Sequence, residues 1–264
     1  MAGCCLTIAG ADSGGGAGVE ADLRTFHAYG LHGCTVHTAI TAQNPFGVFG
    51  VHYLPADFIA AQLDAVLGVY DIRALKTGMM AGAEATAAIA ERLARHPEIA
   101  KVIDPVMIAT SGKRLTDDAS VEVMVRDLMP LATLITPNLP EAKALADRWR
   151  DTSAIPDTSA GAAELARILN GELGVAVLVK GGHAGDDGAV DVLFDGRDIS
   201  RITLPRVESP VSTHGTGCTF ASATSAELAL GEDLLTAVRG AKSYVHKAIA
   251  TSYSVGNACG VLGW

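Results

Sequence analysis

The chain has 264 residues and a mass of 27.1 kDa, with 49% hydrophobic and 19% charged residues. A chain of this length can bury a full hydrophobic core, and this composition excludes an intrinsically disordered protein. The net charge is −9 and the pI is about 5.3. Because no basic excess is present to neutralise nucleic-acid phosphates, we expect no nucleic-acid partner.

The sequence also predicts a protein without a membrane span and without metal-binding cysteine pairs. No uninterrupted apolar run approaches the roughly 20 residues that cross a bilayer, and residues 1–11 lack the basic segment of a signal peptide. Five cysteines are scattered without any C-x-x-C pair: Cys4, Cys5, Cys34, Cys218 and Cys259. We therefore expect neither a zinc site nor a disulfide framework, and a reducing cytoplasm is the simplest location.

Taken in chain order, short apolar runs alternate with helical patterns. Strands are predicted over residues 4–9, 34–42, 48–54, 74–77, 101–103, 133–136, 175–179, 189–194 and 199–204. Helices are predicted over residues 17–29, 57–67, 83–95, 117–129, 141–149, 160–170, 216–230 and 234–252. This alternation predicts an α/β fold with a central, mostly parallel β-sheet flanked by α-helices on both faces. We expect residues 1–264 to form a single domain.

Glycine and polar residues recur where the predicted strands end. They are the glycine-rich segment 10–16, Gly78, Asp104, Asn138 and Lys180. Each alone could be an ordinary turn. In a sheet of this kind, however, ligands bind beyond the carboxyl ends of the strands, so their recurrence at one edge indicates a site.

The familiar nucleotide motifs do not account for these glycines. The P-loop pattern G-x-x-x-x-G-K-[ST] is absent, and residues 16–21 fit the dinucleotide fingerprint G-x-G-x-x-A only nominally. That fingerprint follows its strand directly, and an acidic residue occurs about 20 positions later. Here a six-residue loop intervenes, and no Asp or Glu occurs from Leu23 to Ala56. These departures disfavour a dehydrogenase.

The strongest local signal is residues 213–219, Thr-His-Gly-Thr-Gly-Cys-Thr, directly before a predicted helix. Small residues at a helix start leave backbone N–H groups free, and together with the helix dipole these form an anion site. Cys218 would lie in the first turn, where a thiol pKa is expected to fall. The alternative is a buried cysteine that packs as a small hydrophobe, which the two flanking glycines make less attractive.

Five polar residues have two interpretations each. Asn138 and Glu141 could form a helix cap or could hold hydrated Mg²⁺ beside a phosphate, and the sequence alone favours the cap. Asp104 could join such a cation site or start a turn. Asp22 lies in an amphipathic stretch and could simply face solvent. Lys180 could neutralise a phosphate or be solvated in its loop, so both readings stay open here.

Seven motifs, in order, resemble the hydroxymethylpyrimidine/phosphomethylpyrimidine kinases of thiamine biosynthesis. They are residues 9–23, 41–44, 76–79, 104–107, 136–142, 179–183 and 213–219. The resemblance runs from residue 6 to about residue 250. It implies a ribokinase-like fold, ATP and Mg²⁺ as cofactors, phosphoryl transfer to a hydroxymethyl group and a homodimer.

The resemblance also implies roles for individual residues. The aminopyrimidine would be bound by Gly10, Asp22, Gln43, Met79 and Val106. ATP would be bound by Lys180, Thr213 and Asn138, and Mg²⁺ by Asp104 and Glu141 through water. The anion hole would comprise Gly215, Thr216, Gly217 and Cys218, with Cys218 where sugar kinases of the superfamily carry an aspartate base.

The sequence therefore predicts ATP-dependent phosphorylation of 4-amino-5-hydroxymethyl-2-methylpyrimidine to its monophosphate and then to the diphosphate. Alternatives on the same fold are a pyridoxal/pyridoxine kinase and a non-catalytic pyrimidine-binding protein. A cysteine hydrolase that pairs Cys218 with His214 is a third class, but no orienting Asn or Asp is evident.

A few positions depart from the family pattern. Glu20 stands where many members have glutamine, and we expect its charge to face solvent. Thr110 and Lys113 differ from the common flap sequence. Residues 254–264 lack the usual Gly-Pro-x-x-His ending, which affects the nucleotide edge rather than the chemistry.

Overall fold

The computed structural model describes residues 3–44, 46–107, 116–181, 188–256 and 259–264. Within these ranges the strands are β1 (Cys4–Asp12), β2 (His32–Asn44), β3 (Gly47–Tyr53), β4 (Ile72–Thr77), β5 (Ala100–Ile103), β6 (Leu134–Ile135), β7 (Ala176–Val179), β8 (Ala189–Phe194), β9 (Ile199–Leu204), β10 (Tyr253–Val255) and β11 (Cys259–Val261). The α-helices are α1 (Gly18–Ala28), α2 (Ala56–Leu67), α3 (Ala83–Leu93), α4 (Asp118–Val123), α5 (Leu139–Ala146), α6 (Ser159–Leu173), α7 (Thr216–Ala229) and α8 (Leu234–Ala250).

Nine of the described strands form one sheet in the order β3-β2-β1-β4-β5-β6-β7-β8-β9. Strands β2 to β7 in this order pair in parallel, whereas β3, β8 and β9 add antiparallel edges. The chain leaves β1 toward β2 on one side and returns to β4 on the other. The switch of direction therefore lies between β1 and β4, where ligand crevices form at the carboxyl ends. The predicted mostly parallel sheet is confirmed.

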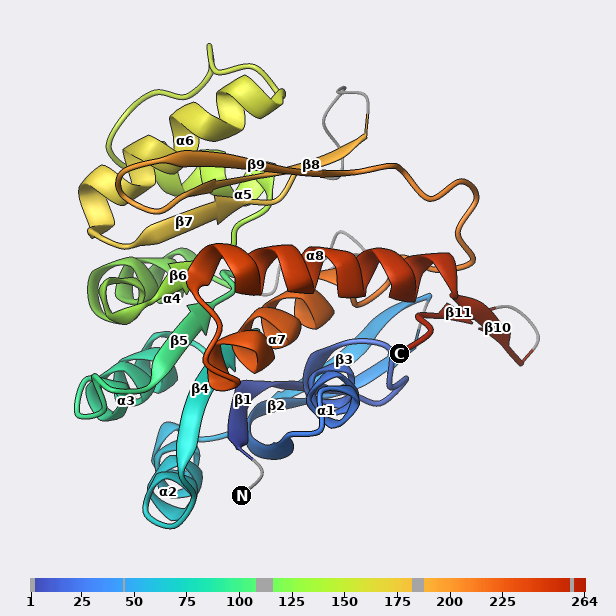
Figure 1. Cartoon of the computed structure of the whole chain (residues 1–264). Helices are drawn as coiled ribbons and strands as arrows, with labels where there is room; N and C mark the ends of the chain where they lie inside the picture. The colour runs from blue at the N-terminus through green and yellow to red at the C-terminus, as the bar shows by residue number, and fades with distance from the viewer. Residues whose placement is uncertain (1–2, 45, 108–115, 182–187, 257–258) are drawn as a thin grey trace.

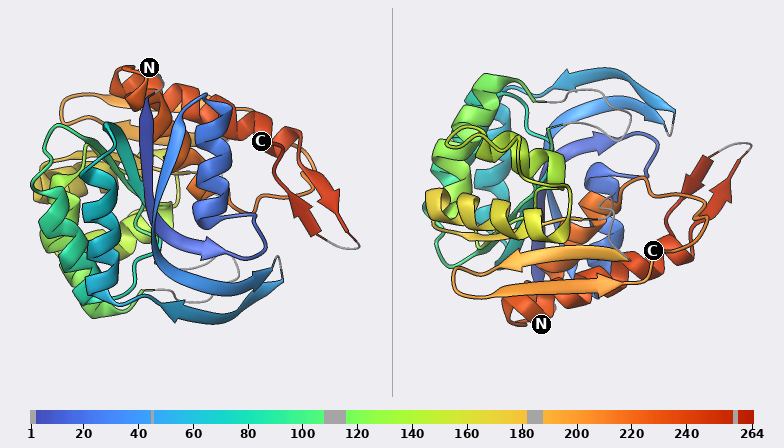
Figure 2. Two further views of the ribbon diagram at one scale, coloured as in Figure 1. Left: turned by 90° about the horizontal axis from the view of Figure 1, so that it is seen from below. Right: turned by 90° about the horizontal axis from the view of Figure 1, so that it is seen from above.

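Helices cover both faces of the sheet, as the two views of Figure 2 show. Helices α1, α7 and α8 pack together on one face, and α2 to α6 lie on the other (Figure 1). The largest hydrophobic cluster lies between the sheet and α2 to α6, and two smaller clusters lie under α1, α7 and α8. None of the helices in the described ranges is long and apolar enough to cross a membrane.

Local sequence signals explain where the long helices begin and end. Thr158 caps α6 by accepting a hydrogen bond from the Gly161 amide, and Gly174 ends that helix in the left-handed conformation, with φ 72°. Asp233 caps α8 in the same way. The predicted bounds of the β8–β9 hairpin are confirmed.

The largest differences from the predicted elements are three wrong boundaries and one strand pair that was not predicted. Strand β1 continues beyond residue 9 to Asp12, because a bulge at Gly10 keeps the chain paired with β2. The predicted helix over residues 117–129 is α4 followed by a π-turn and a 3₁₀ turn that carries Pro130. Helix α5 begins two residues early, after its Asn138 cap, and ends at Ala146. The antiparallel pair β10–β11 was not predicted.

Candidate active site

Gly10 on β1 and Met79 after β4 lie in direct contact at the switch point. A Cβ built on Gly10 would lie 2.4 Å from Met79 Cε, and one built on Gly18 would lie 2.3 Å from the Gly10 carbonyl oxygen. Side chains at these two glycines would therefore overlap their neighbours. The structure brings together two residues that the resemblance assigned to one ring-binding pocket.

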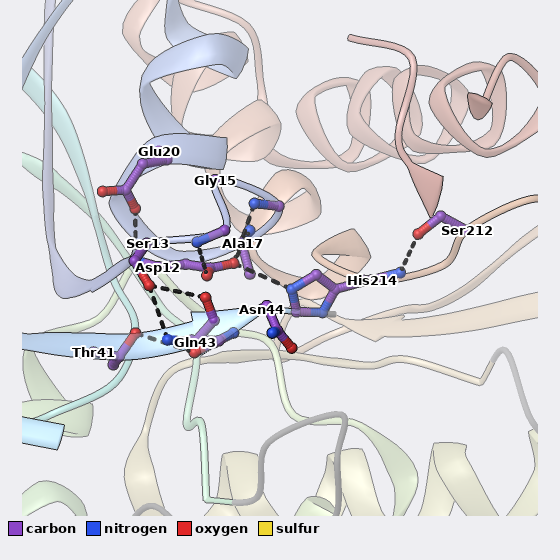
Figure 3. Close-up of polar contacts among 12 residues, drawn as sticks. Asp12, Ser13, Gly15, Ala17, Glu20, Thr41, Gln43, Asn44, Ser212 and His214 are labelled. Atoms are coloured by element: carbon purple, nitrogen blue, oxygen red, sulfur yellow. Dashed lines mark hydrogen bonds and ion pairs between the residues drawn. The ribbon is translucent and has the colours of Figure 1, made fainter. Parts of the chain in front are cut away.

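Gln43 lies beside the same end of β1, and hydrogen bonds to its backbone hold it there. The Ser13 hydroxyl donates to the Gln43 carbonyl oxygen and accepts from the Gln43 amide, both at 2.8 Å. The Thr41 hydroxyl donates to the Ala11 carbonyl oxygen at 2.8 Å and lies 3.3 Å from Gln43 Oε1. The half-buried Gln43 side chain is thus held next to the end of β1 (Figure 3).

A partly buried ion pair lies at the ends of β5 and β7. Lys180 Nζ donates to Asp104 Oδ1 at 2.8 Å, and Thr136 donates to the same oxygen at 3.1 Å. A Cβ built on Gly217 would lie 3.6 Å from Lys180 Nζ and 3.7 Å from Asp104 Oδ2. Although burial opposes the charged amine, Asp104 and then Glu141 raise the pKa of Lys180. Lys180 is therefore a permanent cation beside the start of α7.

Asn138 and Glu141 form the predicted capping box. Asn138 Oδ1 accepts from the Glu141 amide at 2.8 Å, and Glu141 Oε2 accepts from the Asn138 amide at 2.9 Å. Burial raises the pKa of Glu141, while Lys180 opposes the rise. A pocket of about 180 Å³ opens between Lys180 and residues 138–140. The cap is confirmed, and it leaves the Glu141 carboxyl close to the Asp104–Lys180 pair.

Helix α7 begins without a side-chain cap. Its N-cap residue, Gly215, has φ 86°, a conformation that favours glycine. The Thr216 amide makes only a 3.4 Å bond to the Thr213 carbonyl oxygen. In the part of the chain that the structure describes, the amides of Gly217 and Cys218 have no hydrogen-bond acceptor. Unused donors at a helix start have the geometry of an anion site, which supports that prediction.

The Cys218 thiol is half-buried, so it is neither sealed in the core nor fully solvated. Desolvation raises the pKa of Cys218, with Lys76 opposing and Asp22 and Asp104 adding to the rise. The expected fall in the thiol pKa was therefore wrong. The helix start and Lys76 favour the thiolate, but burial next to two carboxylates outweighs them.

Asp22 is the clearest correction to the sequence analysis. Its carboxylate is 0% exposed and pairs with the equally buried Lys76 at 2.9 Å. Thr7 and Ser222 each donate to it at 2.6 Å. The solvent-facing reading is wrong. A direct hydrogen bond from a ring donor to Asp22 is not supported either, because the carboxylate exposes no surface and already accepts four hydrogen bonds.

Lys76 was not singled out from the sequence. It lies on β4 directly beneath the glycine at residue 78, where an added Cβ would be 3.0 Å from Lys76 Nζ. The interaction with Asp22 raises the pKa of Lys76 although desolvation opposes it. A lysine directly after the apolar residues Ala74 and Leu75 of a predicted strand was the signal available in the sequence.

His214 has an acidic partner that the sequence analysis did not find. Its Nε2 lies 3.2 Å from Asp12 Oδ2 (Figure 3). Among the described residues, however, no hydrogen bond joins His214 to the Cys218 thiol, and the charged groups with the largest effect on the pKa of Cys218 are Lys76, Asp22 and Asp104. The arrangement does not favour a cysteine hydrolase, since the histidine and the thiol are not partners.

Glu20 does not behave as expected. Its Oε2 accepts a hydrogen bond from the Asp12 amide at 2.7 Å, so the carboxylate folds over the end of β1 instead of facing solvent. A glutamine oxygen could accept the same bond, which explains why either residue suits this position.

Trp264 lies behind the start of α7. Its indole Nε1 donates to Thr219 Oγ1 at 3.4 Å, and the Arg24 guanidinium lies 4.8 Å from the ring centroid. Arg24 also donates to the Gly15 carbonyl oxygen. The tail thereby contacts both the first glycine loop and α7.

The structure describes some of the remaining predicted residues and not others. Val106 is half-buried after β5, and Thr213 is exposed before α7. Thr110, Lys113 and His183 lie outside the described residues.

A second pocket, of about 210 Å³, lies between the C-terminal ends of α2 and α3, at the opposite edge of the sheet. The carboxyl edge is the better candidate site, since the charged groups and unused amides converge there.

The sequence matches the phosphomethylpyrimidine kinase family over residues 12–263. The chain belongs to the phosphomethylpyrimidine kinase family. It is 45% identical over 252 residues to the hydroxymethylpyrimidine/phosphomethylpyrimidine kinase of Rhizobium meliloti (strain 1021), covering 96% of this chain and 92% of that protein. It is 46% identical over 261 residues to the thiamine biosynthesis bifunctional protein of Geobacter sulfurreducens, covering 98% of this chain but only 51% of that protein.

Solved structures of this kinase family and of pyridoxal kinases share the fold. The phosphomethylpyrimidine kinase of Clostridium difficile 630 has a TM-score of 0.80 at 38% identity, over 94% of this chain and 99% of that one. An ADP complex of Bacillus subtilis pyridoxal kinase has a TM-score of 0.89 at 33% identity, over 99% of this chain and 97% of that one. The ribokinase-like fold implied by the phosphomethylpyrimidine kinase resemblance is confirmed.

Proposed function

We propose that this kinase transfers the γ-phosphoryl group of ATP to the hydroxymethyl group of 4-amino-5-hydroxymethyl-2-methylpyrimidine, and then to the resulting monophosphate. The observation that carries the proposal is the cluster at the start of α7. There the unused amides of Gly217 and Cys218 lie next to the partly buried Lys180–Asp104 pair. Membership of the family supports the choice of substrate.

The chemistry follows from what phosphoryl transfer requires. Catalysis of this reaction depends on positioning and on neutralising charge at the transferred group, with little covalent chemistry for the protein to perform. The amides of residues 215–218 and the Lys180 ammonium would meet that charge. Gly10, Gln43, Met79 and Val106 would hold the aminopyrimidine with its hydroxyl toward Cys218, and Asn138 and Thr213 would flank the ATP.

We further propose that Asp104 and Glu141 hold Mg²⁺ through water. No cluster of three or more His, Cys, Asp or Glu able to hold a metal occurs among the described residues. This fits an ion that keeps most of its waters and is held by one or two carboxylates together with substrate phosphates. Burial raises the pKa of the Glu141 carboxyl, and a nearby cation would stabilise its ionised form. The ion would supply charge neutralisation at the phosphates.

The proposal is tested by following ADP release with the pyrimidine alcohol, its monophosphate and pyridoxine as acceptors. We expect turnover with the first two and loss of turnover in excess EDTA. A preference for pyridoxine would replace the substrate assignment with the second candidate, which the similarity to pyridoxal kinase structures favours. Ring binding without ADP release from any acceptor would indicate a non-catalytic pyrimidine-binding protein.

We propose a homodimer, which uses exposed apolar side chains of β2, β3, α2 and the turn between β2 and β3. These are Ile40, Phe46, Phe49, Tyr53 and Phe58. Phe46 and Phe49 are each 70% exposed, and large apolar side chains exposed to this degree are candidates for an association surface.

Sedimentation is expected to give about twice the 27.1 kDa chain mass. The double variant Phe46→Ser/Phe49→Ser is expected to sediment as a monomer, whereas the control Val69→Ser, at another exposed position, remains dimeric. A wild-type chain that stays monomeric up to high micromolar concentration would refute the dimer. The single-domain organisation and the cytoplasmic location remain part of this proposal.

A further inference from the structure

Asp12 is a buried carboxylate that organises the first glycine loop. It is 3% exposed and accepts hydrogen bonds from the amides of Gly14 at 2.8 Å, Gly16 at 3.1 Å and Ala17 at 2.9 Å. Its fourth partner is His214 Nε2 at 3.2 Å, which must be the donor because an ionised carboxylate only accepts. Figure 3 shows these bonds converging on the one side chain.

The two loops joined by this pair touch through glycines. A Cβ built on Gly16 would lie 2.7 Å from His214 Cδ2, and one built on Gly215 would lie 1.9 Å from the Gly16 carbonyl oxygen. Neither position could carry a side chain without separating the loops. The end of β1 is therefore in van der Waals contact with the segment that leads into α7.

The other side of the Asp12 loop reaches the ring-binding residues. Ser13 is hydrogen-bonded twice to the Gln43 backbone, and Thr41 bridges the Ala11 carbonyl and the Gln43 side chain. Asp12 thus lies between the residues proposed for the pyrimidine and the amides proposed for the phosphoryl group.

The charge of Asp12 is also fixed by these contacts. Burial alone would raise the pKa of Asp12, but His214 and the Gly14 and Ala17 amides lower it overall. The carboxylate therefore stays ionised near neutral pH and holds all four donors at once.

We propose that Asp12 and His214 act as a pair of positioning residues, which sets the distance between the bound acceptor hydroxyl and the amides at the start of α7. The inference rests on the proposed function. Neither side chain touches the reacting atoms. Because misplacement of reacting groups by about 1 Å can cost about 100-fold in rate, loss of the pair should act on turnover more than on binding.

The test is a double-mutant cycle on the full chain, using Asp12→Asn and His214→Leu. We expect kcat to fall about 10- to 100-fold in each single variant, with both KM values within about threefold of the wild type. We expect the double variant to be no slower than the slower single variant, because one interaction has been removed. His214→Gln, which keeps a donor, should recover most of the rate. Glu20→Gln is the control and should match the wild type, because Glu20 lies on α1, accepts from the Asp12 backbone amide and has no hydrogen bond to His214.

Three results would overturn the inference: a rise in KM at unchanged kcat, rate losses that multiply in the double variant, or equal losses in His214→Leu and His214→Gln. If Asp12→Asn does not fold, as judged by circular dichroism, the comparison of the two His214 variants decides alone. The cycle is run with whichever acceptor the wild-type chain turns over best. A wild type that prefers pyridoxine therefore refutes the substrate assignment while the positioning pair is still tested.

Discussion

Replacing Lys76 by methionine is expected to lower the free energy of unfolding by about 3–5 kcal/mol. Lys76 and Asp22 are both 0% exposed, and their ion pair is closed off by the Thr7 and Ser222 hydroxyls. Removing the amine leaves a carboxylate buried without its counter-charge, which costs far more than the net value of the pair. Urea denaturation of the wild type and the variant measures the loss.

Two further variants test whether the loss of stability comes from leaving a buried charge without its partner. The double variant Lys76→Met/Asp22→Leu should recover much of the loss, because no unpaired charge remains. Lys143→Met removes the lysine of the solvent-exposed Lys143–Asp157 pair and should cost less than about 1 kcal/mol. A loss below about 1 kcal/mol for Lys76→Met as well would show that water reaches the Asp22 carboxylate.

Replacing Cys218 by alanine is expected to lower turnover of the pyrimidine alcohol about 10²- to 10⁴-fold, the range for a positioned base. Turnover of the monophosphate should fall much less, since that acceptor oxygen is already ionised at pH 7. ADP release with each acceptor measures the two effects, and Cys259→Ser controls for loss of a thiol elsewhere. Equal losses with both acceptors would remove Cys218 from the role of base.

The raised pKa of Cys218 also predicts how the rate should depend on pH if Cys218 is the base. Desolvation keeps the sulfur protonated at pH 7, so only a small fraction of the protein carries the thiolate. If the thiolate is the base, the rate with the alcohol should climb as pH rises through the neutral range, and Cys218→Ala should abolish the climb. A climb that persists in the variant would assign the titration to another group.

Local sequence patterns were sufficient for the fold because they repeat along the chain. Strands β1, β4, β5 and β6 are each followed by a helix, and caps such as Thr158 and Asp233 mark where helices begin. The errors occur where pairing or packing with distant residues overrides local preference. Gly10 looks like a turn residue in sequence, yet pairing with β2 carries the strand to Asp12.

The candidate site was predictable to the extent that its residues lie at strand ends or at a helix start. Gly10 and Met79 are brought together, as are Asp104, Lys180 and Gly217. The pairing of Asp22 with Lys76 and of Asp12 with His214 was not predictable, because the partners lie 54 and 202 positions away in the sequence. Only the fold shows that Asp22 on α1 pairs with Lys76 on β4 in the core, or that His214 supplies a hydrogen bond to Asp12 in the first glycine loop.

The contact of Trp264 with Arg24 and Thr219 provides a built-in optical reporter. The chain has two tryptophans, and the other, Trp149, is exposed beyond the end of α5. Changing Trp149 to phenylalanine leaves one fluorophore, whose indole lies against the anchor of the first glycine loop and the first turn of α7. Its emission would follow rearrangement of those two segments in stopped-flow mixing with nucleotide, so the steps before chemistry could be timed without attaching a dye.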